Sequence, residues 1–153
     1  QELEGLYPKA AFLDSREVVL FGEKGFVLYQ ADSKKIETQE NFESEINSVF
    51  CTNQKLGFIF KNEDDNGKYR MEIYNKAGKK SSTYYFDLDY SGMTADDDEV
   101  ILYNDEEMLI YQMGGRVRFR GTFNTAVTGV MPSWEDGLYW LIDDQSLREI
   151  RIR

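Results

Sequence analysis

Carboxylates are the most frequent reactive groups in the sequence, and they gather in short polar segments. The clusters fall at residues 64–65, 96–98, 105–107 and 143–144. A calcium site needs about six to eight oxygen ligands at set positions around a loop, and the segment after Asp64 lacks the spacing of a calcium-binding loop. Aspartate is also common in turns because its side chain hydrogen-bonds to its own backbone. The clusters therefore predict turns and no metal site.

Paired carboxylates have a second possible use. Two of them at a fixed separation can hydrolyse a glycosidic bond, one as the acid and the other as base or nucleophile. However, 28 acidic residues make chance pairs unavoidable, and catalytic carboxylates lie in clefts with perturbed pKa values. We therefore expect a non-enzymatic protein and keep a carboxylate-dependent hydrolase or lyase as the alternative. A deep cleft with two converging carboxylates would favour the enzyme, and a flat face rimmed by aromatic residues would favour binding.

Other catalytic chemistry has few residues to use. The sequence contains no histidine, and Cys51 is its one cysteine, so zinc sites and histidine-dependent triads lack their groups. No phosphate-binding loop or dinucleotide fingerprint occurs. Val49 and Phe50 precede Cys51, and apolar neighbours predict a buried, unreactive thiol. No cofactor is expected.

Aromatic residues are the best candidates for ligand binding, because Trp and Tyr are enriched at binding hot spots and offer flat apolar faces. Trp134, Tyr139 and Trp140 cluster near the end of the chain. Trp140 lies inside the apolar run LYWLI and is expected to pack between sheets. Trp134 follows Pro132 in a predicted turn and is the expected exposed anchor, with Tyr139 as the second candidate ligand-binding residue.

The charge of the chain limits its partners. Its 18 basic and 28 acidic residues give a formal net charge of −10. This argues against nucleic acid, which needs a basic surface, and against anionic membranes. No apolar run is long enough to span a bilayer, and the first residues, QELEGLYPK, do not predict a signal peptide. An acidic surface keeps a protein in solution, which is the favoured interpretation, or selects a basic partner.

Short β-rich runs separated by Asn, Asp and Gly organise the chain around one stretch. Between Tyr90 and Phe123 the sequence YSGMTADDDEVILYNDEEMLIYQMGGRVRFRGTF predicts four strands joined by three tight turns. Partial copies of this antiparallel meander fill the rest of the chain. The expected strands are residues 10–14, 17–21, 26–30, 36–42, 46–50, 56–60, 69–74, 81–88, 91–95, 99–103, 107–113, 117–123, 127–131, 138–142 and 147–152.

The copies repeat at a nearly constant distance. The second strands begin at Val18, Leu56, Val100 and Leu138, so successive repeats lie 38, 44 and 38 residues apart. A period near 40 with four strands per repeat is typical of β-propellers. The second strands are the most continuously apolar, which predicts burial on both faces. The third strands alternate, as at Met71 and Ile73, and residues 36–42 are polar like an outermost strand.

The fold prediction is therefore an all-β, β-propeller-like protein of about four blades, each a four-stranded antiparallel meander. Residues 1–153 form a single domain, with repeats at about 10–44, 45–89, 90–126 and 127–153, and the last blade lacks its fourth strand.

Several segments carry a family resemblance, which covers most of the chain from about Ala10 onward. The chain resembles the C-terminal part of an uncharacterised family from Gram-positive anaerobic bacteria. The most specific segment is ILYNDEEMLIY with the following GGRVRFRGTF, and the resemblance continues through Val130-Met131-Pro132 and the closing LYWLIDDQSLREIRI. Its members are similar to WD-type and pyrroloquinoline-quinone-type propellers in repeat pattern, and they carry an N-terminal membrane anchor. The resemblance implies an extracellular or cell-surface location and supplies no functional residues.

Two assemblies suit four such blades. Residues 1–7 could supply the missing outer strand and close a small ring. Alternatively, the chain is an arc of a longer propeller, completed by the remainder of that propeller or by a second copy in a homodimer. The arc is favoured because the chains of the resembling family are longer. In either case we expect a non-enzymatic extracellular module whose loops bind a protein, peptide or glycan.

Overall fold

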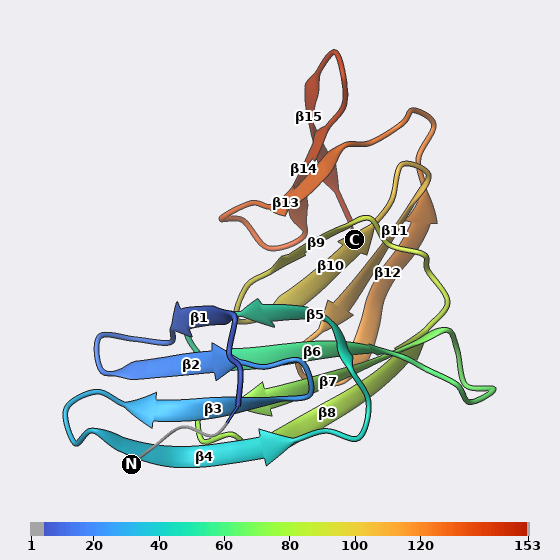
Figure 1. Ribbon diagram of the computed structural model, residues 1–153. Helices are drawn as coiled ribbons and strands as arrows, with labels where there is room; N and C mark the ends of the chain where they lie inside the picture. Colours follow the sequence, from blue (N-terminus) through green and yellow to red (C-terminus); the bar gives the residue numbers. More distant parts are fainter. Residues whose placement is uncertain (1–4, 153) are drawn as a thin grey trace. The chain divides into compact units, whose positions relative to one another are not determined.

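The computed structural model describes residues 5–152, and these residues form fifteen β-strands and no helix (Figure 1). The strands are β1 (Lys9–Phe12), β2 (Glu17–Phe21), β3 (Gly25–Gln30), β4 (Lys35–Asn41), β5 (Ile46–Cys51), β6 (Lys55–Lys61), β7 (Tyr69–Asn75), β8 (Lys80–Phe86), β9 (Gly92–Ala95), β10 (Glu99–Tyr103), β11 (Glu107–Gln112), β12 (Arg116–Thr122), β13 (Gly129–Pro132), β14 (Leu138–Ile142) and β15 (Leu147–Arg151).

The strands form four antiparallel sheets in chain order. Sheet 1 has the order β1-β2-β3-β4, sheet 2 the order β5-β6-β7-β8, sheet 3 the order β9-β10-β11-β12, and sheet 4 the order β13-β14-β15. Each predicted repeat is thus one meander, because short turns let consecutive strands pair directly. The predicted all-β, propeller-like fold is confirmed. As expected, the last sheet has one strand fewer within the described part of the chain.

The predicted strand limits agree closely with the structure. The strands at residues 17–21, 99–103 and 138–142 have the predicted bounds. The largest differences are of two residues, at the ends of β1 and β8 and at the start of β13. β13 begins at Gly129 and not at Val127, since the Val127 amide donates to the Asp105 carbonyl outside the sheet. Of the proposed closing strand at residues 1–7, residues 1–4 lie outside the described residues and residues 5–7 form no strand.

Two compact units divide the chain between Phe86 and Asp87. The first, Gln1–Phe86, holds sheets 1 and 2, and the second, Asp87–Arg153, holds sheets 3 and 4. We call them the N-terminal unit and the C-terminal unit. The boundary falls between the second and third repeats, three residues before the limit expected from the sequence.

The core of the N-terminal unit is built from aromatic rings. Phe58 on β6 is fully buried, and its ring centroid lies 4.9 Å from that of Phe26, 5.1 Å from Phe42 and 5.5 Å from Tyr74. These rings come from strands of both sheets and from the segment after β4. The two sheets of the unit therefore pack through one aromatic cluster.

The third strands of sheets 1 to 3 are buried as continuously as the second strands, contrary to the predicted alternation, whereas β15 is mostly exposed. On β7, Met71 and Ile73 are fully buried, and Glu72 between them is only 6% exposed. The Glu72 carboxylate is compensated locally, since Tyr74 Oη donates to its Oε2 at 2.8 Å and Arg70 Nε lies 3.2 Å from its Oε1. A charged residue between apolar ones, such as Glu72 between Met71 and Ile73, therefore does not mark an exposed face of the strand.

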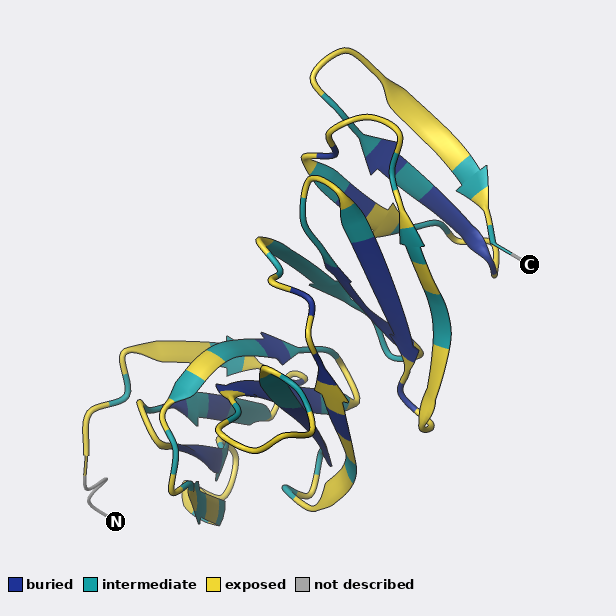
Figure 2. Cartoon of the chain, turned by 90° about the vertical axis from the view of Figure 1, so that its right-hand side faces the viewer, coloured by how far each residue is buried: buried dark blue, intermediate teal, exposed yellow. Residues whose placement is uncertain are grey.

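The fourth strands face solvent, as predicted for residues 36–42. Residues of β4 alternate between exposed and half-buried, and β8 and β12 also carry many exposed residues (Figure 2). In the C-terminal unit the buried cluster includes Ile101, Met108, Ile110, Val130, Tyr139 and Leu141, from the inner strands of sheets 3 and 4.

Gly57 on β6 pairs with Phe50 on β5, and a methyl group at residue 57 would overlap the Phe50 ring. We expect Gly57→Ala to lower the free energy of unfolding by about 1–3 kcal/mol, because the overlap forces buried groups to shift. Urea unfolding measures the loss. Gly114→Ala is the control, since its added methyl meets nothing within 4 Å. Equal losses in both variants would contradict the steric explanation.

Candidate functional site

Turns between the first and second strands share one hydrogen-bond pattern in sheets 1 to 3. A side-chain oxygen accepts hydrogen bonds from the backbone amides two and three residues later. The distances are 2.8 and 3.0 Å for Asp14, 3.2 and 3.0 Å for Thr52, and 2.8 and 2.9 Å for Asp96. The Asp143 carboxylate caps the turn before β15 in the same way. The predicted turn role of these carboxylates is therefore confirmed at Asp96 and Asp143.

The corresponding turn in sheet 4 is longer and lacks this cap. Pro132 pairs with Tyr139, so the β13–β14 turn encloses residues 133–138, two more than the turns of sheets 2 and 3. Ser133 opens the turn through its amide, which donates to the Leu138 carbonyl at 2.9 Å, but its buried hydroxyl has no hydrogen-bond partner in the described structure. Insertions in one repeat often mark the binding face of a repeat protein.

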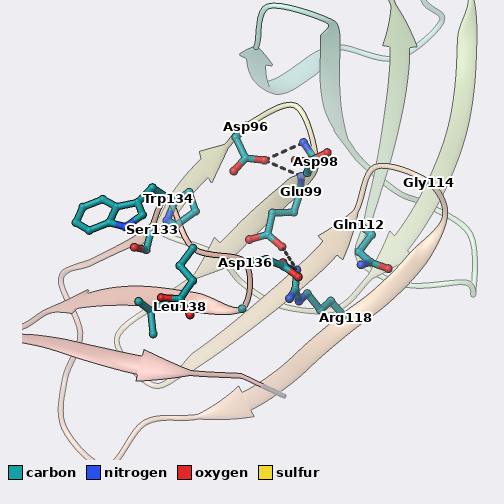
Figure 3. A pocket seen from close by; sticks show the side chains of 13 residues that line it. Asp96, Asp98, Glu99, Gln112, Gly114, Arg118, Ser133, Trp134, Asp136 and Leu138 are labelled. Carbon is teal, nitrogen blue, oxygen red and sulfur yellow. Dashed lines mark hydrogen bonds and ion pairs between the residues drawn. The ribbon is translucent and has the colours of Figure 1, made fainter.

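The longer turn borders a groove of about 550 Å³ within the C-terminal unit (Figure 3). Its walls come from the β9–β10 turn, β12 and the β13–β14 turn. We call it the acidic groove and define it by six of its lining residues, namely Asp96, Asp98, Glu99, Arg118, Trp134 and Asp136.

Glu99 is the buried charge of the acidic groove, with 6% of its surface exposed. Its Oε2 accepts a hydrogen bond from Tyr139 Oη at 2.9 Å and another from Arg118 Nη1 at 3.2 Å. Burial raises the pKa of Glu99, while the bonds from Tyr139 and Arg118 act in the opposite direction. Burial and the bond to Glu99 also raise the pKa of Tyr139. These contacts join β10, β12 and β14, so they tie sheet 3 to sheet 4.

Arg118 also binds a second carboxylate of the groove. Its Nη1 lies 2.6 Å from Asp136 Oδ1, and this bond lowers the pKa of Asp136. The two carboxylates therefore have pKa values shifted in opposite directions, as acid–base pairs of hydrolases do. Arg118 Nη1 contacts both of them, however, so both carboxylates are engaged in ion pairs with the same guanidinium.

The two aromatic residues predicted to bind a ligand occupy different places. Trp134 is 91% exposed and lines the acidic groove, as expected for an anchor. Tyr139 is 1% exposed and belongs to the core cluster, so its ring is not available at the surface. Its hydroxyl instead holds the Glu99 carboxylate.

Sequence reasoning missed Glu99 and Arg118. The signal for Glu99 is a charged residue that opens the buried run EVILY, yet this position resembles any turn carboxylate. Its burial depends on Tyr139, which lies 40 residues later. No local pattern distinguishes Arg118 from Arg116 and Arg120 in the segment RVRFR.

Three further findings concern the Cys51 thiol, metal-binding clusters and membrane-spanning helices. Cys51 is half-buried and not fully buried as predicted, and burial raises the pKa of its thiol, which keeps it protonated. Within residues 5–152, no three acidic, cysteine or histidine side chains are placed to hold a metal ion. The same residues include no helix that is long and apolar enough to cross a membrane.

Fold and groove together define a propeller-like β-repeat protein with a groove between its third and fourth repeats. The chain belongs to the family of unknown function DUF5711, whose model matches residues 3–152. The resemblance to an uncharacterised propeller-like family is thereby confirmed. No curated protein matches the chain in sequence.

Solved structures of similar fold share little sequence with the chain. BBS1N in complex with ARL6DN matches with a TM-score of 0.63 at 13% identity, over 99% of this chain and 53% of that one. A eukaryotic initiation factor matches with a TM-score of 0.67 at 10% identity, over 99% and 42%. BamB from Moraxella catarrhalis matches with a TM-score of 0.54 at 13% identity, over 87% and 39%. The chain thus spans about half of these proteins or less, and the likeness concerns the fold alone.

Proposed function

We propose that the chain is a non-enzymatic interaction module that binds a protein, peptide or glycan through the acidic groove, with Trp134 as its anchor. The observation that carries this proposal is the longer β13–β14 turn, which exposes 91% of Trp134 beside a groove of about 550 Å³. Exposed tryptophan on a rigid scaffold is the residue type most often found at binding hot spots.

A hydrolase is the second candidate, and one observation favours it. Glu99 and Asp136 line the same groove and have pKa values shifted in opposite directions. Both are bound by Arg118, so the two carboxylates are already held in ion pairs with one guanidinium and are not poised as a free acid and a free base. Binding without turnover is therefore the better explanation of the groove.

The wider setting is also a proposal. We infer an extracellular or cell-surface location from the family resemblance. BBS1N was solved in complex with ARL6DN, which supports a protein as the partner. The chain spans 53% or less of the similar structures, which supports an arc completed by the remainder of a longer propeller or by a second copy.

Trp134→Ala is expected to weaken ligand binding about 30-fold, because a hot-spot aromatic residue contributes about 2 kcal/mol. The measurement is binding of the wild-type chain and the variant to an array of overlapping peptides and bacterial cell-wall glycans, with dissociation constants determined for every ligand found. Mass spectrometry of the array ligands after incubation detects any cleavage.

Phe12→Ala is the matched control, since Phe12 is an aromatic residue with 75% exposure on β1, far from the groove in sequence. It should bind every ligand like the wild type. Unchanged binding of Trp134→Ala to all ligands would reject the groove as the binding site. Cleaved peptides or glycans would reject the non-enzymatic function and favour the hydrolase.

A further inference from the structure

The lining of the acidic groove has an unbalanced charge. It contains five carboxylates and one guanidinium, contributed by Asp96, Asp98, Glu99, Glu135, Asp136 and Arg118. Charges of one sign in a concave site concentrate the electric field there and attract the opposite charge. A hollow of about 520 Å³ in the N-terminal unit differs, since Lys24 and Lys61 offset the acidic residues in its lining and no aromatic residue lines it.

Some of these carboxylates already have partners. Asp136 binds Arg118 at 2.6 Å, Glu135 binds Arg151 at 2.6 Å, and Asp96 Oδ1 accepts two backbone amides. These contacts explain the β13–β14 turn and the β9–β10 turn. Glu99 Oε1 and the Asp98 carboxylate have no such side-chain or backbone partner among the described residues.

Two polar atoms of the groove have no hydrogen-bond partner among the described residues, and one of them, the Ser133 hydroxyl oxygen, is buried. Both hydrogen bonds to Glu99 end on Oε2, so Oε1 of this 94% buried residue accepts none from the described residues. Figure 3 shows one carboxylate oxygen of Glu99 toward Arg118 and the other turned away from it. The buried Ser133 hydroxyl is also unpaired. A buried hydroxyl without a partner costs free energy, and Glu99 Oε1 is a charged acceptor that no described residue uses, so both atoms point to a donor bound in the groove.

We propose that the acidic groove binds a single cationic side chain, the guanidinium or ammonium group of an arginine or lysine in a basic peptide segment. This inference rests on the proposed function and names its ligand. The cation donates to Glu99 Oε1 and to the Asp98 carboxylate, which has no side-chain partner in the described structure, and its flat or apolar part stacks on the exposed Trp134 ring. Guanidinium carries five N–H donors and ammonium three, and both cations are attracted to the face of a tryptophan ring.

Charge also decides against the other ligand classes. A neutral sugar could stack on Trp134 but would leave the excess negative charge of the groove unbalanced. A phosphate-bearing or uronic-acid glycan would be repelled by the same carboxylates. A basic peptide fits both the aromatic ring and the charge, and it agrees with the formal net charge of −10.

The test uses the intact chain and two short peptides, acetyl-Gly-Gly-Arg-Gly-Gly-amide and its citrulline analogue, which has the same shape and no charge. Trp140→Phe is introduced so that fluorescence reports Trp134 alone. We expect the arginine peptide to bind with a dissociation constant of about 1 mM or below, with weaker binding at higher salt. The citrulline peptide should bind at least tenfold more weakly.

Three variants locate the cation, and all are compared by calorimetric titration with the arginine peptide. Glu99→Gln and Asp98→Asn should each weaken binding about fivefold to tenfold, because each removes one charge-assisted hydrogen bond. Asp64→Asn is the control. It removes one exposed carboxylate from the N-terminal unit, so it should leave binding unchanged. If Glu99→Gln fails to fold, Asp98→Asn decides, since Asp98 is exposed and supports no other residue through its side chain.

Equal binding of the arginine and citrulline peptides would overturn the proposal, and so would unchanged binding in Asp98→Asn. These failures differ from failure of the proposed function. If the array ligands that depend on Trp134 are neutral or anionic, the groove is an interaction site with another ligand class. If no ligand depends on Trp134, both proposals fall.

Discussion

Replacing Arg118 with methionine is expected to lower the free energy of unfolding by about 3 kcal/mol, the lower end of the range for breaking a buried ion pair. Arg118 Nη1 lies 3.2 Å from Glu99 Oε2, and the Glu99 side chain is only 7% exposed. Methionine keeps the apolar stem and removes the charge, so the Glu99 carboxylate would keep only the Tyr139 hydroxyl as a donor. Urea unfolding at neutral pH measures the loss.

The loss in Arg118→Met should shrink as the pH falls. In the wild-type chain the pKa of Glu99 in the folded state lies above 4.5. Between that pH and the raised pKa the folded state binds more protons than the unfolded state, so the free energy of unfolding decreases as the pH rises through this window. Without Arg118, which lowers this pKa, the window extends further upward. The difference between the two proteins is therefore largest at neutral pH and small below pH 4.5.

Arg120→Met on the same strand is the matched control. Arg120 is 56% exposed on its side chain and pairs with the half-buried Glu107 at 3.4 Å. Exposed pairs of this kind contribute about 0–1 kcal/mol, so this variant should lose little stability and show no added pH dependence. Similar losses in both variants, or an Arg118→Met loss that does not change with pH, would show that Glu99 does not depend on Arg118.

Turns and strands were predictable because their signals are local. The second strands at residues 17–21 and 99–103 were found with their correct limits, since an apolar run followed by Asn, Asp or Gly marks both the strand and its end. The capping role of Asp96 follows from its own backbone neighbours. The repeat spacing then gave the number of sheets without any knowledge of their contacts.

Only part of the acidic groove could be predicted from the sequence. Some of its features depend on neighbouring residues, and others depend on contacts between residues far apart in the chain. The exposure of Trp134 follows from a turn after Pro132, which is a local feature. The burial of Tyr139 and Glu99 is a contact between sheets, since Tyr139 on β14 donates to Glu99 on β10. A tyrosine in an apolar run is equally compatible with a surface or a core position until its hydroxyl partner is known.

The longer turn in sheet 4 explains why the groove occurs where sheets 3 and 4 meet. This turn is two residues longer than the turns of sheets 2 and 3. The Ser133 hydroxyl caps no backbone amide there, and Trp134 and Asp136 lie at the surface. Gly137 then closes the turn with a φ of +76°, a conformation that favours glycine, and its carbonyl accepts the Ile152 amide at 2.8 Å. The strand scaffold is therefore shared by all repeats, whereas the groove lies between the third and fourth repeats and takes Trp134 and Asp136 from the longer turn.

Phe58→Ala is expected to lower the free energy of unfolding by about 3–5 kcal/mol, the range for removing a buried phenylalanine. The Phe58 ring is fully buried and stacks on Phe26 at 4.9 Å with an interplanar angle of 21°. It also meets Phe21 edge-on at 6.0 Å. Its removal leaves a cavity where sheets 1 and 2 pack, and the surrounding strands are held by their own ladders and cannot collapse into it.

Phe58→Leu and Phe12→Ala separate the causes of this loss, with urea unfolding followed by far-ultraviolet circular dichroism. Leucine refills most of the space, so Phe58→Leu should recover a large part of the stability but not the ring stacking, which is worth about 0.5–1.5 kcal/mol. Phe12 is 75% exposed, so its loss should change stability by about 0.5 kcal/mol or less. A Phe58→Ala loss no greater than that of Phe12→Ala would mean that the aromatic cluster does not hold the N-terminal unit together.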